Sequence, residues 1–382
     1  MIRLQFTVAC AALLGAGVAQ GHESASPVPA GAAFTTLVTT PLAIEGLTGD
    51  SQAKLYTTGR APGAGLPCPV WRVALHSVSP VLVGQVPAPS AAAQCSPSGI
   101  ALGSNGALFI SEADTLYTVM PNAAAPALAS VYAAGVPGTN GLAFDRHGTL
   151  WTGDGTTGLG RVWQISTAGV VTEVLRIPPM ANAAAVGRSA VTLPANTAQP
   201  LVANGVAFTH DGDMLVADTA RGALWRVDFD RQGRLKSPVG CDTTYTANTL
   251  CLSAVWVAHP LLEGVDGIAL DRAGNIWAAA NERNAIVVVT VDEGRARKVV
   301  EAYRNAPAAS GLRNAGPLEF PTSPFLLGDL LCTANSDGNR RDNAPNTAGE
   351  IGGPGQPRGK ITCMDPRLPI PGLPLPVTRR SH

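Results

Sequence analysis

The chain has 382 residues, of which 46% are hydrophobic and 14% are charged, so it can bury a large core. Lys and Arg balance Asp and Glu at 27 each, which gives a formal net charge of zero at pH 7. A neutral chain has no electrostatic attraction to nucleic acid or to an anionic membrane surface, so we expect neither as a partner.

The first 21 residues have the features of a secretory signal peptide. They combine Arg3, the apolar run "TVACAALLGAGVA" and small residues at Ala19 and Gly21. The apolar run is too short to cross a membrane as a helix, so the mature chain is expected to have no integral membrane segment. We therefore predict a secreted or periplasmic protein, with a flexible leader at residues 22–32.

A pattern of sixteen residues recurs along the chain, and "NGVAFTHDGDMLVADT" (204–219) is its clearest copy. Position 4 is always small, position 9 is glycine in five copies, and positions 11 and 12 are always large and apolar. Ala53 is the exception at position 9. The six copies start at Glu45, Ser98, Asn140, Asn204, Asp266 and Phe320.

Each copy has the pattern of a β-hairpin, which is not stable alone in water. The copies are spaced about 42–64 residues apart, and such a period with strand patterns is typical of propeller blades. Further strands are predicted at 222–230 and 284–292. A closed ring of sheets would bury both faces of every blade. We therefore predict an all-β, six-bladed β-propeller over residues 33–365, with extra length in loops around 172–201 and 234–260.

Seven cysteines include Cys10 of the signal peptide, which leaves six in an exported chain. The repeat places the remaining cysteines in local pairs, and we predict Cys68–Cys95, Cys241–Cys251 and Cys332–Cys363. Buried free thiols are the alternative. Beyond them, residues 366–382 are rich in proline, which predicts an extended tail with few contacts to the ring.

The sequence contains no His-Glu-x-x-His, Cys-x-x-Cys or Gly-x-Ser-x-Gly motif, so common zinc and serine-hydrolase sites are not indicated. Position 1 of the repeat is the more informative feature. The innermost strands of a propeller run in one direction, so these residues would form a ring at one mouth of the central channel. Five of the six are polar, and Glu45 and Asp266 are acidic.

Two carboxylates that converge in a partly dry channel are costly unless a cation joins them. The ring contains no Lys or Arg, and Asn204 adds an amide oxygen. Oxygen ligands without thiolate or imidazole favour Ca²⁺, with Mg²⁺, Mn²⁺ or Zn²⁺ as alternatives. A set of turn-capping residues around a water-filled channel is the other interpretation.

The Asn-Gly, Asp-Gly and Glu-Gly starts on six propeller repeats resemble the senescence marker protein/gluconolactonase family, also called regucalcin-like. The resemblance implies that Glu45, Asn204 and Asp266 hold one divalent cation and that Asn140 helps to hold a substrate. Two departures are visible. Leu47 and Thr48 replace the usual Pro-Trp pattern after Glu45-Gly46, and Gly138 stands where sugar-lactone members carry an arginine.

The functional hypothesis is an exported, metal-dependent hydrolase of a lactone or a related ester, with a small-molecule substrate. Asp266 would be the ligand or base that takes a proton, and Asn140 would orient the substrate. One alternative is a non-catalytic secreted propeller that binds a protein or a glycan at its mouth. Another is a strictosidine-synthase-like lyase that uses Glu45. The sequence does not indicate an oligomeric state.

Overall fold

A computed structural model describes residues 33–75, 77, 79–180, 202–292, 295–305, 316–328, 330–336 and 358–364. The predicted signal peptide (1–21), leader (22–32) and tail (366–382) lie outside these residues. Among the residues described, no helix is long and apolar enough to cross a membrane.

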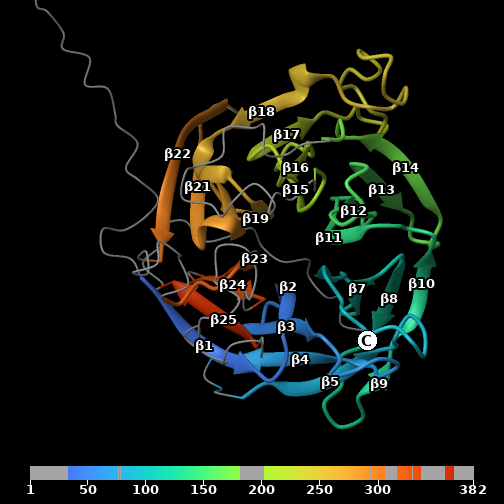
Figure 1. Ribbon diagram of the computed structural model, residues 1–382, viewed down its shortest axis with the longest axis vertical. Helices are drawn as coiled ribbons and strands as arrows, with labels where there is room; N and C mark the ends of the chain where they lie inside the picture. The colour runs from blue at the N-terminus through green and yellow to red at the C-terminus, as the bar shows by residue number, and fades with distance from the viewer. Residues whose placement is uncertain are drawn as a thin grey trace, which may run out of the picture.

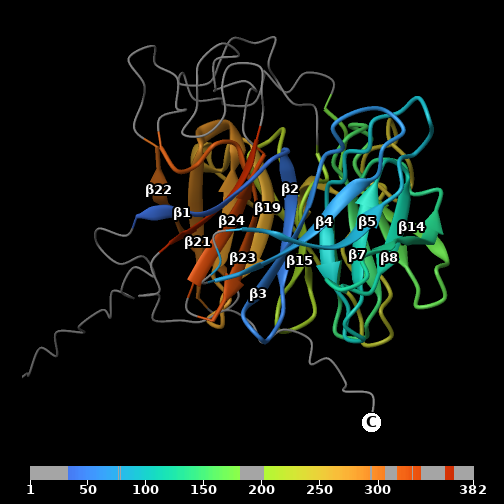
Figure 2. The ribbon, with the colours of Figure 1, turned by 90° about the horizontal axis from the view of Figure 1, so that it is seen from below.

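Six antiparallel sheets form a ring around a central axis, as Figure 1 shows, and Figure 2 shows the ring edge-on. The chain is therefore a six-bladed β-propeller, as predicted. The innermost strands are β2 (Ile44–Gly49), β6 (Ile100–Leu102), β11 (Thr139–Phe144), β15 (Val206–Phe208), β19 (Val265–Leu270) and β23 (Pro321–Leu327). We number the blades 1 to 6 in this order.

The outer strands of each blade pair in order outward from the inner strand. The second strands are β3 (Lys54–Gly59), β7 (Leu108–Glu112), β12 (Leu150–Asp154), β16 (Met214–Asp218), β20 (Ile276–Ala280) and β24 (Leu330–Asn335). The third strands are β4 (Cys68–Ala74), β8 (Thr115–Val119), β13 (Arg161–Ile165), β17 (Ala223–Val227), β21 (Ala285–Asp292) and β25 (Gly359–Met364). The outermost strands are β5 (Val81–Val86), β10 (Ser130–Ala134), β14 (Val171–Arg176), β18 (Val255–Ala258), β22 (Arg295–Arg304) and β1 (Phe34–Thr40).

Three details depart from a simple ring of four-stranded blades. Blade 1 gains a fifth strand, β9 (Ala127–Leu128), which pairs parallel to β5. Blade 6 takes its outermost strand, β1, from the start of the propeller. The predicted loops at 172–201 and 234–260 contain much of β14 and all of β18, because each of these blades still needs a fourth strand. Short 3-10 helices connect strands at η3 (Leu252–Ala254), η4 (Pro260–Leu262) and η5 (Asn281–Arg283).

The core consists of apolar layers between neighbouring blades. Trp151 and Val162 of blade 3, for example, pack against Met214 and Trp225 of blade 4. Similar layers lie between each of the remaining pairs of adjacent blades, including blades 6 and 1. Both faces of each sheet are thus buried, which explains why the strands are not simply alternating in polarity.

The turn in the middle of the repeat has one conformation in all six copies. Gly106, Gly148, Gly212, Gly274 and Gly328 at position 9 have positive φ angles, which glycine adopts without strain. Ala53 takes the same conformation, with φ 60°, although it has a side chain. The alanine therefore marks the same turn and not a break in the pattern.

The three predicted disulfides are confirmed. Cys68–Cys95, Cys241–Cys251 and Cys332–Cys363 have Cα–Cα distances of 5.7, 5.4 and 4.0 Å. Each closes a local loop, and the third joins β24 to β25 within blade 6. Three disulfides are typical of proteins in an oxidising compartment.

Candidate functional site

Successive inner strands touch one another at position 2 of the repeat, which is glycine in blades 1 to 5. A Cβ on Gly46 would lie 2.5 Å from the carbonyl oxygen of Ser98, and one on Gly267 would lie 2.5 Å from that of Thr322. The ring closes where the hydroxyl of Thr322 donates to the carbonyl of Glu45 at 2.6 Å. The residues at position 1 therefore follow one another around the axis.

Position 1 lies inside the inner strand in three blades and just before it in the other three. Glu45, Asn140 and Asp266 are the second residues of β2, β11 and β19, and each sits where the strand pairing shifts register. Such β-bulges re-aim a side chain from the regular alternation of a strand.

Three of the four predicted site residues are neighbours in this ring. Asn140, Asn204 and Asp266 belong to blades 3, 4 and 5, and the backbone N–H of Gly205 donates to the carbonyl of Asp266 at 3.1 Å. All three residues are buried. Glu45 of blade 1 lies two blades from Asp266 and three from Asn204.

Asn204 has one buried oxygen without a protein partner. Its side-chain Nδ2 donates to Thr219 Oγ1 at 3.1 Å, and Thr219 Oγ1 donates to the carbonyl of Val265 at 2.6 Å. Asn204 Oδ1 is buried and accepts no hydrogen bond. An unsatisfied buried oxygen costs about 1–3 kcal/mol, so this atom is suited to a ligand that supplies positive charge.

Asp266 is also held by a neighbouring amide. Its Oδ2 accepts a hydrogen bond from Asn281 Nδ2 at 3.0 Å, and Asn281 begins η5 directly after β20. Both side chains are buried. The contact fixes one carboxylate oxygen and orients the group at the end of the inner strand.

Glu45 has a cationic neighbour that the sequence analysis did not anticipate. Arg60 Nη2 lies 3.9 Å from Glu45 Oε2, and both side chains are partly exposed. The position 1 ring has no Lys or Arg of its own, but Arg60 at position 16 brings a positive charge to it. Arg60 therefore offsets part of the negative charge of Glu45, which reduces the electrostatic need for a cation at this carboxylate.

The glycine at position 155 leaves space for the Asn140 side chain. A Cβ on Gly155, which is position 16 of blade 3, would collide with the amide of Asn140. Gly138 has φ +83°, and a Cβ there would overlap the carboxylate of Asp154. An arginine at position 138 would require Asp154 to move and would strain the backbone, because the side chain would overlap the Asp154 carboxylate.

Acidic residues at position 15 form a second feature near these strand ends. Asp154 is buried and paired with Arg161 at 2.9 Å, and Asp218 is buried and paired with Arg221 at 2.8 Å. Burial raises the pKa of Asp218, and Arg221 offsets part of this effect. These two ion pairs satisfy charges within a blade, so we assign them to structure.

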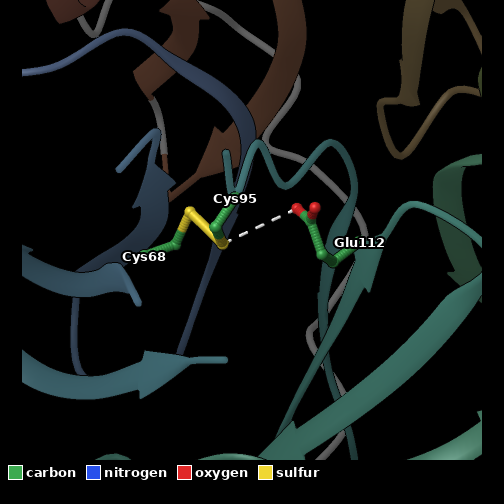
Figure 3. Close-up of side chains that lie close together, drawn as sticks. All are labelled: Cys68, Cys95 and Glu112. Atoms are coloured by element: carbon green, nitrogen blue, oxygen red, sulfur yellow. Dashed lines mark hydrogen bonds between the residues drawn. A yellow bond between two sulfur atoms is a disulfide. The ribbon is translucent and has the colours of Figure 1, made fainter. Parts of the chain in front are cut away.

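Glu112 is the position 15 acid of blade 2, and it lies against the Cys68–Cys95 disulfide (Figure 3). Glu112 Oε2 is 3.7 Å from Cys95 Sγ and accepts the backbone N–H of Ser96 at 2.8 Å. Within the described ranges this is the one close group of three His, Cys, Asp or Glu side chains. It is not a metal site, because disulfide sulfurs have no thiolate to offer.

Burial raises the pKa of Glu112 to about 7, although the Ser96 N–H and the charge of Arg60 lower it in part. A pKa raised on folding stabilises the protein below the unfolded value of 4.5, and this contribution is lost as the pH rises through about 7.

We therefore expect the wild type to lose about 2–3 kcal/mol of unfolding free energy between pH 4.5 and 8 because of Glu112. The Glu112→Gln variant should not show this loss. Denaturant unfolding at several pH values measures the difference between the variant and the wild type. Asp114→Asn removes an exposed carboxylate two residues away and is the control. Identical pH dependence in the wild type and Glu112→Gln would contradict the expectation.

Position 16 contains the residues that the sequence analysis missed. Strand pairing brings position 16 back beside position 1, so Arg60, Thr219 and Asn281 contact Glu45, Asn204 and Asp266, respectively. The signal was available in the repeat, because a hairpin of sixteen residues must place its two ends side by side. It was hidden because position 16 differs in chemistry from blade to blade.

Comparisons with known proteins agree with this architecture. Residues 188–309 match the profile of the SMP-30/gluconolactonase/LRE-like region, and this segment includes Asn204 and Asp266. The resemblance noted in the sequence is therefore confirmed for this part of the chain. No curated protein sequence matches the chain significantly.

Among solved structures, a luciferin-regenerating enzyme is similar, with 14% identity and a TM-score of 0.58 over 90% of this chain and 98% of that one. Regucalcin of Agrobacterium tumefaciens, a calcium-binding protein, has 20% identity and a TM-score of 0.56 over 89% and 95%. A proposed gluconolactonase has 16% identity and a TM-score of 0.50 over 91% and 95%. At these identities the structures show a shared fold.

Proposed function

We propose that the protein is an exported, metal-dependent hydrolase of a lactone or a related ester, with its site at the channel mouth. The observation that carries the proposal is the buried Asn204 Oδ1, which has no hydrogen-bond partner and lies in the ring next to Asp266. Its chemistry fits a hard divalent cation, which oxygen ligands prefer. The matched family segment and the calcium-binding structural relative support the same assignment.

Glu45, Asn204 and Asp266 would hold the cation, with Ca²⁺ favoured over Mg²⁺, Mn²⁺ and Zn²⁺. Asn204 would offer Oδ1, and Asp266 would offer the carboxylate that Asn281 orients. Glu45 would offer its carboxylate, whose Oε2 lies 3.9 Å from Arg60 Nη2. When bound, a divalent cation polarises a carbonyl and lowers the pKa of a bound water.

The chain's own residues would complete the reaction. Asp266 would accept the proton released when water attacks the carbonyl carbon of the substrate. Asn140 lies in blade 3, two blades from Asp266. Its amide would donate to the substrate and fix the orientation of the substrate. Arg60 would limit the negative charge at the mouth and so the cost of holding Glu45 ionised next to other carboxylates.

The test is to measure bound metal and hydrolysis together. Purified protein is treated with a chelator, reloaded with Ca²⁺, Mg²⁺, Mn²⁺ or Zn²⁺, and assayed against γ- and δ-lactones and simple esters. We expect one tightly bound divalent ion per chain and hydrolysis that is lost on chelation and restored by reloading. A folded protein that binds no divalent cation would instead support the non-catalytic binding propeller.

A further inference from the structure

We propose that Thr219 is a positioning residue that sets which end of the Asn204 amide faces the cation, and that it ties this ligand to the strand of Asp266. The inference rests on the proposed metal site and names a residue outside the ligand set. Thr219 is the last residue of the repeat in blade 4 and is 1% exposed. It contacts Asn204 of its own blade and Val265 of blade 5.

The orientation of the Asn204 amide depends on which acceptor takes the single hydroxyl proton of Thr219. Thr219 Oγ1 lies 2.6 Å from the carbonyl oxygen of Val265, an acceptor without a proton, so the hydroxyl must donate there. The lone pairs of Oγ1 then accept from Asn204, which can only do so with Nδ2. The amide is thereby oriented with Oδ1 away from Thr219.

A flipped amide would place Asn204 Oδ1 against Thr219 Oγ1 with no proton between them. Two acceptors in contact repel each other, and the hydroxyl could turn to Oδ1 only by leaving the Val265 carbonyl without its donor. The same flip would aim two N–H protons, rather than an oxygen, at the cation. Thr219 therefore selects the amide rotamer that can bind metal.

Thr219 also acts on the second ligand through the backbone. Val265 directly precedes Asp266, and the Gly205 N–H donates to the Asp266 carbonyl at 3.1 Å. Blade 4 thus donates hydrogen bonds to the carbonyls of both Val265 and Asp266 in blade 5. Outer contacts of this kind commonly change metal affinity by about 10–100-fold.

Not every hydroxyl at the ring has this role, which provides a matched control. Ser98 Oγ donates to the carbonyl of Thr139 at 3.1 Å and so clasps blades 2 and 3. Ser98 Oγ also contacts the hydroxyl of Ser111 at 2.9 Å, and it makes no contact with a candidate ligand side chain. Ser98→Ala removes a hydrogen bond between blades 2 and 3 without affecting the side-chain amide of Asn204.

The experiment measures divalent-cation affinity by calorimetry on the full-length mature chain, without using hydrolysis. We expect Thr219→Val, which keeps the shape and removes the hydroxyl, to raise the Kd for Ca²⁺ about tenfold or more. Thr219→Ser keeps the hydroxyl and should bind as the wild type does. Ser98→Ala should also leave the Kd unchanged.

A second background separates orientation from general support. In Asn204→Asp both side-chain ends are oxygens, so a flip no longer matters, and Thr219→Val should raise the Kd much less than it does beside Asn204. An equal effect in both backgrounds would show that Thr219 acts only by packing, and would overturn the proposal. If Thr219→Val does not fold, Thr219→Ala is used with the same expectations.

The outcomes also separate this inference from the proposed function. A wild type that binds no cation from the set used, namely Ca²⁺, Mg²⁺, Mn²⁺ and Zn²⁺, contradicts the metal site and the inference together. A wild type that binds a cation, with Thr219→Val unchanged in affinity, overturns the role of Thr219 alone. A tenfold loss in Thr219→Ser would likewise overturn it, because the hydroxyl is still present.

Discussion

Asp266→Asn should weaken divalent-cation binding by about 10²-fold and reduce lactone hydrolysis by at least about 10²-fold. The substitution keeps the size of the side chain and its ability to accept from Asn281 Nδ2, but it removes one of the two carboxylates assigned to the metal. Both the polarisation of the carbonyl and the activation of water depend on the ion, so activity should fall with affinity. Calorimetric titration and initial rates at one fixed metal concentration, close to the Kd of the wild type, measure the two effects.

Two ring variants serve as controls for Asp266→Asn. Asn140→Ala should retain the metal and impair turnover, because Asn140 is assigned to the substrate only. Ser98→Ala should change neither quantity strongly. Full cation affinity in Asp266→Asn would exclude this carboxylate as a ligand and leave the metal-dependent mechanism without its base.

Gly99→Ala should be among the most destabilising single substitutions in the chain. The new Cβ would overlap the carbonyl oxygen of Asn140 and lie 3.0 Å from its carbonyl carbon. The obstacle is backbone of the adjacent blade, which cannot rotate away as a side chain can. Overpacking of this kind costs about 3 kcal/mol or more, which corresponds to a drop in Tm of about 5–10 °C.

Gly63→Ala is the matched control, since a Cβ at this position would meet only Leu66 Cδ1 at 3.7 Å. Its φ angle lies outside the left-handed region, so alanine should be tolerated within about 1 kcal/mol. Thermal unfolding of both variants gives the comparison. Equal Tm values for Gly99→Ala and Gly63→Ala would mean that the ring at the axis is looser than the contacts of Gly99 indicate.

The propeller could be predicted from the sequence because the repeat encodes local geometry. Position 9 needs a left-handed conformation, and positions 11 and 12 fill the layers between blades, as Leu150 and Trp151 do. Both constraints act within one hairpin, so each copy carries them. The fourth strands β14 and β18 were not recognised in full because they lie outside the sixteen-residue repeat, and β18 also follows a long connection from β17.

The ring of position 1 residues was foreseen, whereas the contacts that orient them were not. Asn204 Oδ1 becomes a candidate ligand atom only because Thr219 accepts from Nδ2 and donates to Val265, a residue of another blade. No pattern within a single repeat contains this relation. Arg60 was missed for a similar reason, since its approach to Glu45 depends on pairing between β2 and the end of β3.

Gly138 shows how structure can explain a departure from a sequence pattern. The absence of arginine there weakened the comparison with sugar lactones, but it left open whether an arginine could be restored. The positive φ and the adjacent Asp154 carboxylate disfavour any side chain at this position, because it would strain the backbone and displace Asp154. A change of specificity towards sugar lactones would therefore begin more readily at a different residue.

The pairing of β1 with β25 has a consequence for the order of events during synthesis. Phe34–Thr40 emerges from the ribosome first among the strands, yet its partner Gly359–Met364 is made more than three hundred residues later. Until then blade 6 lacks β25 and its pairing with β1, so Phe34 and Met364 do not yet complete the apolar layer that contains Trp277 and Val288 of blade 5. The ring of blades therefore closes only after β25 has been translated. The nascent chain cannot form a complete propeller before that point.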